Sequence, residues 1–312
     1  MVAPPALEFD LINPRIIVLL IMFLPLLAAA ELQVVVIEGL GGEERYAEQF
    51  AEQVVALESA ASSLTTSDRI RIFRSGDFAR EAVVGFFAEL AGVLQADDRL
   101  AVFLIGHGSY DDHEYKFNIA GPDLTDGDLF DMLNEINSRQ LLINTGSSSG
   151  ALADRLKSDE RTLILATRSG AERHATRFGH YFVAALSDGS ADLDKNRMVT
   201  AEEAYEFAAR QVADYYERNG QLATEHPKIE GEHAARFSLA RLGAAQPVRE
   251  DSQLRILIGQ RDAVNAEIED LRLRRDGMTP DAYQAELLNN MLELATLEEE
   301  IERREAELEN ER

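Results

Sequence analysis

The stretch Arg99-Leu-Ala-Val-Phe-Leu-Ile-Gly-His107-Gly108-Ser109 decides the fold of this chain. Its apolar residues predict a buried strand over 99–105, and the glycines that follow place His107 just beyond the carboxyl end of that strand. A second stretch, Leu142-Ile-Asn-Thr-Gly-Ser147-Ser-Ser149-Gly150, is built in the same way and places Ser147 beyond a strand over 140–144. In an open parallel sheet this edge is where ligands and chemistry collect.

Outward from these stretches, short apolar segments alternate with longer amphipathic ones. We expect strands over 32–37, 69–73, 99–105, 140–144 and 161–167, and helices over 43–58, 78–94, 124–134, 151–156, 176–186 and 200–218. Short apolar strands separated by helices predict a mostly parallel sheet that is covered on both faces. The expected fold class is therefore α/β, a three-layer sandwich, in a domain over 31–242.

The amino-terminal end has the pattern of a secretory signal. Residues 16–27 form an uncharged apolar run of twelve, with Arg15 before it and Ala28-Ala29-Ala30 after it. This run is short for a permanent membrane span, which needs about 20 residues. We therefore predict a signal peptide over 1–30 and export to the periplasm of a bacterium or to the outside of the cell.

The carboxyl-terminal end differs in composition from the α/β domain. A linker over 243–250 leads to a segment over 251–312 that is rich in Glu, Leu, Arg and Ala, with Leu287, Leu294, Ile301 and Leu308 spaced by sevens. Thr279 as an N-cap and Pro280 at the first helical position predict a break between two helices. We expect an antiparallel helical hairpin or coiled coil that docks on a partner or on a second copy. The alternative is a solvated helical tail.

Charge and cysteine content exclude several functions. The formal net charge of −25 would repel nucleic acid and anionic lipid, so neither is an expected partner. The chain has no cysteine, which excludes disulfides and thiol chemistry.

The two strand-end motifs resemble the catalytic His-Gly and Cys-x-Ser-Gly motifs of the legumain/caspase-like cysteine peptidases. His107 and Gly108 match the first motif and Ser149-Gly150 the end of the second, while Ser147 stands at the position of the nucleophilic cysteine. The resemblance spans about residues 32–231 and implies a caspase/legumain-like fold. It also implies an oxyanion hole at Gly108 and the nucleophile position, and part of a substrate pocket at Arg168 and Ser169.

Serine at the nucleophile position changes the expected chemistry. A thiol has a pKa of about 8.5 and a hydroxyl one several units higher, so serine needs a hydrogen-bonded base that a third group orients. Only Asp111, Asp112 and Glu114 lie near His107 in the sequence. We therefore expect an inactive homologue that needs no cofactor and binds a peptide or protein in the former active-site cleft.

Three alternatives stay open at this point. The chain could be an active peptidase or esterase that uses Ser147 with His107. It could be a scaffold that acts through its carboxyl-terminal helices. His107 itself could be a turn histidine that is hydrogen-bonded to the backbone.

Residues 192–203 have the spacing of an EF-hand calcium loop. The ligand positions 1, 3, 5, 7 and 12 fall on Asp192, Asp194, Asn196, Met198 (through its carbonyl) and Glu203. Such oxygen-rich spacing suits calcium, which takes six to eight hard ligands. Arg197 stands at position 6, where glycine is usual. We expect a calcium site here; the alternative is a capped helix start with Thr200 as the N-cap.

Overall fold

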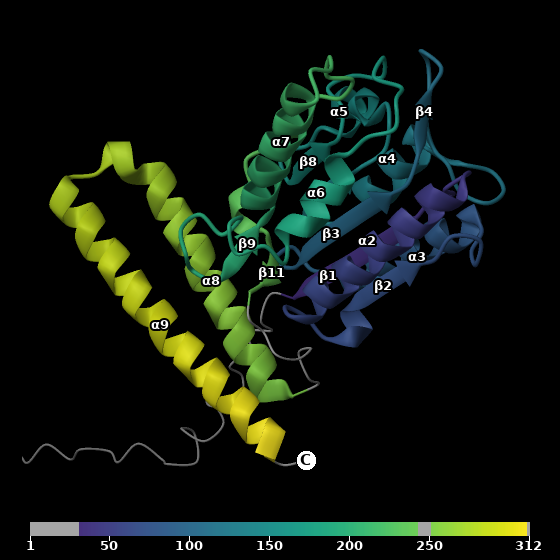
Figure 1. Cartoon of the computed structure of the whole chain (residues 1–312). Coiled ribbons are helices and arrows are strands. Elements are labelled where there is room, and N and C mark those ends of the chain that lie inside the picture. Colours follow the sequence, from purple (N-terminus) through teal and green to yellow (C-terminus); the bar gives the residue numbers. More distant parts are fainter. Residues whose placement is uncertain (1–30, 243–250, 311–312) are drawn as a thin grey trace, which may run out of the picture.

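The computed structural model describes residues 31–242 and 251–310 (Figure 1). The predicted signal segment over 1–30 and the linker over 243–250 lie outside the described residues. Within the described ranges, no helix has both the length and the apolar character that crossing a membrane requires.

A six-stranded sheet forms the centre of the molecule, in the order β10-β8-β7-β3-β1-β2. Its strands are β1 (Leu32–Glu38), β2 (Ile70–Phe73), β3 (Arg99–Ile105), β7 (Arg139–Asn144), β8 (Arg161–Leu165) and β10 (Lys228–Glu230). All neighbours are parallel except β10, which runs antiparallel to β8. The α/β class and the mostly parallel sheet are thereby confirmed.

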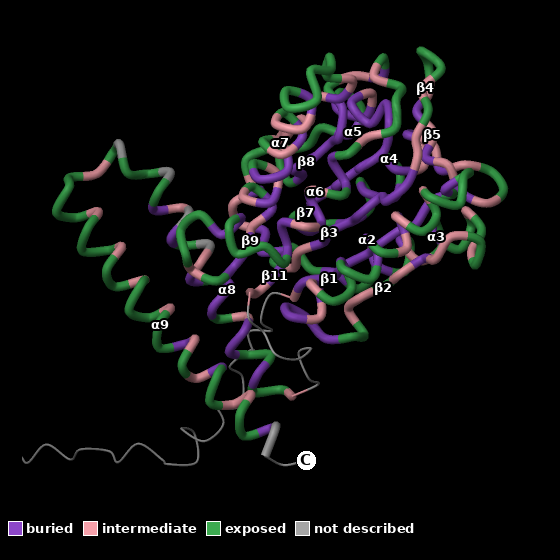
Figure 2. Tube along the Cα trace, viewed as in Figure 1, coloured by how far each residue is buried: buried purple, intermediate pink, exposed green. Residues whose placement is uncertain are grey.

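Helices cover both faces of this sheet, and each face has its own apolar core. Because side chains alternate along a strand, Val34 and Val36 of β1 join one core while Val35 and Ile37 join the other. The first core is closed by α2 (Glu44–Ser62), α6 (Phe178–Ala185) and α7 (Ala201–Arg218), and the second by α3 (Arg80–Val93), α4 (Asp126–Asn134) and α5 (Ala153–Leu156). Figure 2 shows the buried residues concentrated in the sheet between these helices.

Several short elements depart from the predicted pattern. They are the antiparallel strands β4 (Gly108–Tyr110), β5 (Tyr115–Phe117) and β6 (Leu124–Thr125), the pair β9 (Met198–Thr200) and β11 (Ser238–Arg241), and the single 3-10 turns η2 (Ser67–Arg69), η3 (Ser149–Leu152) and η4 (Ala234–Arg236). The helix predicted from residue 124 begins at Asp126, because Thr125 and Asp128 form a capping box. The helix predicted over 151–156 begins as the 3-10 turn η3.

The carboxyl-terminal helices form a hairpin of α8 (Ser252–Arg274), the turn η5 (Arg275–Gly277) and α9 (Pro280–Asn310). Thr279 accepts a hydrogen bond from the Ala282 N–H at 3.3 Å, so the predicted break is confirmed. Ile301 and Leu308 of the seven-residue spacing lie in one apolar cluster with Leu254 and Ile258 of α8. The predicted hairpin therefore packs on itself along this spacing, and docking of the helices on a partner or a second copy stays a prediction.

Ion pairs attach this hairpin to the α/β domain. The pairs are Arg99–Asp262, Arg236–Asp270, Arg241–Glu305, Arg197–Glu302 and Arg272–Asp194. Asp262 of α8 is buried between Arg99 and its own neighbour Arg261. Burial by itself raises the pKa of Asp262, but the two guanidinium groups outweigh it and hold that pKa below its ordinary value.

We expect Asp262→Ala to destabilise the protein by about 3–5 kcal/mol, because it removes the carboxylate that the buried Arg261 shares with the partly buried Arg99. Glu299→Ala, on the exposed side of α9, is the control and should change stability by less than about 0.5 kcal/mol. Urea unfolding measures both. Because the folded-state pKa of Asp262 is depressed, its contribution is complete above about pH 4 and is lost as the pH falls further. Equal effects of the two variants would contradict this role.

Candidate functional site

The carboxyl ends of β3 and β7 are packed backbone to backbone. A Cβ atom on Gly108 would lie 2.1 Å from the Tyr115 hydroxyl and 2.7 Å from the Ser147 carbonyl oxygen. One on Gly146 would lie 2.9 Å from the Gly106 carbonyl oxygen. The glycines of the two motifs are therefore required by close approach, and they bring the segment of His107 beside that of Ser147.

The imidazole of His107 is held by α2. Its ring centroid lies 4.7 Å from that of Tyr46 and 5.1 Å from that of Phe50, both edge to face. Burial lowers the pKa of His107, against a hydrogen bond to the Gly41 backbone and the charge of Glu43. The part of the chain that the structure describes contains no hydrogen bond between His107 and Ser147.

No acid orients His107 from the neighbouring turn. Asp111 accepts hydrogen bonds from the backbone of His113 and Glu114, Asp112 pairs with Arg173, and Glu114 pairs with Lys116. The acids near His107 in the sequence thus have other partners in the structure.

The loop after β7 is rigid and largely buried. Ser147 is 4% exposed, and Ser148 has a left-handed backbone with a φ of 58°. The Ser149 hydroxyl accepts a hydrogen bond from the Thr167 N–H at 3.2 Å, and the Gly150 N–H donates to the Thr167 hydroxyl at 2.9 Å. Ser149 and Gly150 therefore anchor this loop to the end of β8, while Ser147 stands nearest to the Gly108 turn.

The segment after β8 carries a cluster that the sequence did not reveal. Arg168 has a side chain that is 66% exposed, and its Nε lies 3.2 Å from Oε1 of Glu172. The same oxygen lies 2.6 Å from Nδ1 of His226. The Glu172 carbonyl accepts a hydrogen bond from the Ser148 N–H at 2.8 Å. The Ser169 carbonyl accepts one from the Thr167 hydroxyl at 3.2 Å.

The residue before His226 is a buried carboxylate that joins this segment to α6 and α7. Glu225 accepts hydrogen bonds from the N–H groups of Arg177 and Phe178 at the start of α6 and from the Tyr216 hydroxyl. Burial raises the pKa of Glu225, and these donors oppose the rise. Glu172 and His226 come from separate segments with no recognisable spacing, so only the fold brings them together.

Three buried polar atoms around this edge have no hydrogen-bond partner among the residues that the structure describes: Oε1 of Gln53, Oδ1 of Asn118 and Oγ of Ser148. Gln53 lies beside Gly179, close to Thr145 at the end of β7, and the Asn118 N–H donates to the His107 carbonyl. Buried polar groups are normally paired, so unpaired ones call for an explanation such as a bound ligand or water.

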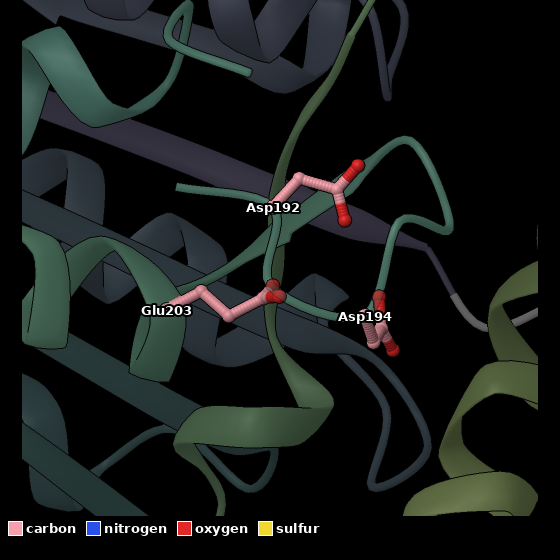
Figure 3. Close-up of side chains that lie close together, drawn as sticks. All are labelled: Asp192, Asp194 and Glu203. Atoms are coloured by element: carbon pink, nitrogen blue, oxygen red, sulfur yellow. The ribbon is translucent and has the colours of Figure 1, made fainter. Parts of the chain in front are cut away.

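The second predicted site is the loop over 192–203. One carboxylate oxygen from each of Asp192, Asp194 and Glu203 lies within 4.8 Å of the other two. Figure 3 shows these three side chains on the loop and at the start of α7. Asn196 and Met198 are joined by a hydrogen bond of 2.7 Å from the Met198 N–H to the Asn196 side chain.

The same loop also forms the predicted helix cap. Thr200 and Glu203 make a capping box at the start of α7, and Glu203 accepts a further hydrogen bond from Leu193. Arg197 adopts a left-handed φ of 66° at the position where glycine is usual, and its guanidinium turns to Glu302 of α9 at 3.2 Å. The cluster of three carboxylates and the capped helix start therefore coexist in this loop.

Comparisons with known proteins add little. No family model matches the chain, and no curated protein matches it. Among solved structures, it is similar to the crystal structure of protein GSU0716 from Geobacter sulfurreducens, with a TM-score of 0.43 and 12% identity over 69% of this chain and 100% of that one. A similarity of this size carries no argument about function.

Gly108→Ala tests the packing between the two motifs. The added Cβ must displace the Tyr115 hydroxyl and the Ser147 carbonyl, so we expect a loss of about 1–3 kcal/mol in thermal or urea unfolding. Gly85→Ala is the matched control, because Gly85 lies in α3 with open space around it and alanine there should stabilise by about 0.5–1 kcal/mol. A neutral Gly108→Ala would refute the close approach.

Proposed function

We propose that this chain is an exported, catalytically silent relative of the legumain/caspase-like peptidases, with the three-layer fold of that family. In this proposal the carboxyl edge of the sheet binds an extended segment of a peptide or protein without cleaving it. The observation that carries the proposal is the close packing of the Gly108 turn on the Ser147 carbonyl, with no hydrogen bond between His107 and Ser147 among the described residues.

The state of His107 supports the absence of turnover. A serine nucleophile needs an imidazole within hydrogen-bond reach and a third group that orients this imidazole. The His107 ring instead packs on Tyr46 and Phe50 and bonds to the Gly41 backbone. Its charged form, which would arise on taking the serine proton, is disfavoured by burial.

The exposed side chain of Arg168 supports a bound ligand at the same edge. Its guanidinium can donate to a peptide carbonyl or carboxylate. The unpaired oxygens of Gln53, Asn118 and Ser148 are buried and do not belong to this binding surface. Export, and self-association or partner docking through the carboxyl-terminal helices, belong to the proposal as predictions from the sequence.

Ser147→Cys places a single thiol in a chain that otherwise has none. We expect a peptidyl acyloxymethyl ketone to label this variant at least about tenfold faster than Ser187→Cys, after each rate is divided by the rate with iodoacetamide. The peptide part holds the reactive group at the introduced thiol only if the edge binds peptides. Ser187, exposed at the end of α6, is the matched control.

The unmodified protein completes this test with a fluorophosphonate probe. We expect no labelling of Ser147. Labelling that is abolished by Ser147→Ala would instead show that the protein is an active hydrolase. Equal normalised rates for the two cysteine variants would contradict peptide binding at this edge.

We also propose that the loop over 192–203 binds calcium. A lone EF-hand loop usually lacks the strand pairing that a second loop provides, and here β11 supplies it through Ala240 opposite Val199. Asp192, Asp194 and Glu203 supply the carboxylates. Turning Arg197 toward Glu302 directs its charge away from the loop. Calcium bound there would neutralise these acids and brace the start of α7.

We expect calcium at 100 times its Kd to raise the unfolding free energy by about 2.7 kcal/mol. Glu203→Gln should abolish this gain, while Glu202→Gln, one residue away and exposed, should keep it. Thermal melts with calcium, then with chelator, measure the effect. If calcium does not change the melting temperature of the unmodified protein, the proposed calcium site is wrong.

A further inference from the structure

Helix α9 exposes large apolar side chains to solvent. Leu288, Met291 and Leu292 are 58%, 55% and 60% exposed. Figure 1 shows α9 as the outer helix of the hairpin, and Figure 2 shows it exposed along much of its length. Apolar residues scattered singly over a surface need no explanation, but neighbouring ones on one helix form a patch that marks an interaction site.

The two leucines belong to a row of residues with the spacing of a coiled-coil seam. Steps of three and four residues alternate along Ala285, Leu288, Leu292 and Ala295. All four are exposed, whereas Ile301, on the face of α9 that packs on α8, is fully buried. The small alanines at both ends let another backbone approach closely. This row, the outer seam, therefore has the form of a docking site for a helix.

The outer seam lies in a strongly acidic part of α9. Residues 281–299 contain five acids and no lysine or arginine. Asp281 and Glu299 continue the row at its two ends, four residues before Ala285 and four after Ala295, and both are exposed. Negative charge is therefore placed where the ends of a docked helix would meet it.

Most of this charge is not compensated within the described chain. Glu298, Glu302 and Glu305 of α9 are paired with arginines of the α/β domain. Within residues 31–242 and 251–310, the other acids of residues 281–299 form no ion pair: Asp281, Glu286, Glu293 and Glu299. These four carboxylates lie around the outer seam, which is the arrangement that a positively charged partner complements.

The charge also decides which occupant fits the outer seam. A second copy of α9 would bring the same acids into one contact, and repulsion between like charges opposes this. A helix with apolar residues at the matching spacing and with lysine or arginine beside them buries Leu288 and Leu292 and neutralises the carboxylates.

We propose that the outer seam binds a basic amphipathic helix of another protein. The inference rests on the partner docking that the proposed function includes, and it names the chemistry of that partner. None of the residues of the outer seam lies at the carboxyl edge of the sheet, so a failure here would leave peptide binding at that edge intact.

The test is a titration of the full chain with a fluorescein-labelled synthetic peptide of leucine, alanine and lysine. Its leucines are spaced by three and four residues over the length of the outer seam. A control peptide has the same composition and charge in an order without this spacing, so it cannot present its leucines on one face. At physiological ionic strength, which screens non-specific attraction, we expect the control peptide to bind at least about tenfold more weakly in fluorescence anisotropy.

Two double variants locate the binding. Leu288→Gln with Leu292→Gln should weaken the spaced peptide about tenfold and leave the control peptide unchanged. Val55→Gln with Val93→Gln is the matched control, because these valines lie on α2 and α3 and are each 57% exposed. This second pair should change the affinity less than twofold.

Three results would overturn the proposal. The first is equal affinity for the spaced and the control peptide, and the second is an equal loss of affinity in both double variants. The third is a dimer of the unmodified chain in analytical ultracentrifugation that Leu288→Gln with Leu292→Gln dissociates, because a second copy would then be the occupant.

Discussion

Strand β3 is hydrogen-bonded in parallel to β1 on one side and to β7 on the other, and its residues are buried from Leu100 to Ile105. Parallel pairing places the ends of these strands at one edge, and burial on both faces leaves their register little freedom. The His-Gly turn and the serine loop are neighbours because of this pairing. The second cluster at Glu172 follows, since β8 adds to β7 in the same direction.

The chemistry at this edge depends on which groups the fold leaves unpaired. The His107 ring is engaged by α2, and Ser149 and Gly150 are engaged by Thr167. The unpaired oxygens of Gln53, Asn118 and Ser148 are buried and closed to solvent. Proton transfer needs groups that are bonded to one another, and the described residues contain no such bond between His107 and Ser147.

Sequence reasoning predicted the parts of the fold that rest on long periodic patterns. The five parallel strands and the longer helices follow from apolar runs, and the Thr279-Pro280 break follows from local cap chemistry. The three-residue strand β10 and the small β4–β5–β6 sheet were not predicted, because a strand of two or three residues is too short to show a periodic pattern. Pairs such as Glu172 and His226 also escaped, since only tertiary contact joins segments 54 residues apart.

Strand β2 is the outer strand of the sheet on the side away from β10. It has only four residues, and the Arg71 guanidinium lies over the rings of Phe73 and Phe86, at 4.8 Å and 5.6 Å from their centroids. A short outer strand that carries a charge is a poor template for a further strand from another molecule. The open sheet is in this way protected against edge-to-edge aggregation.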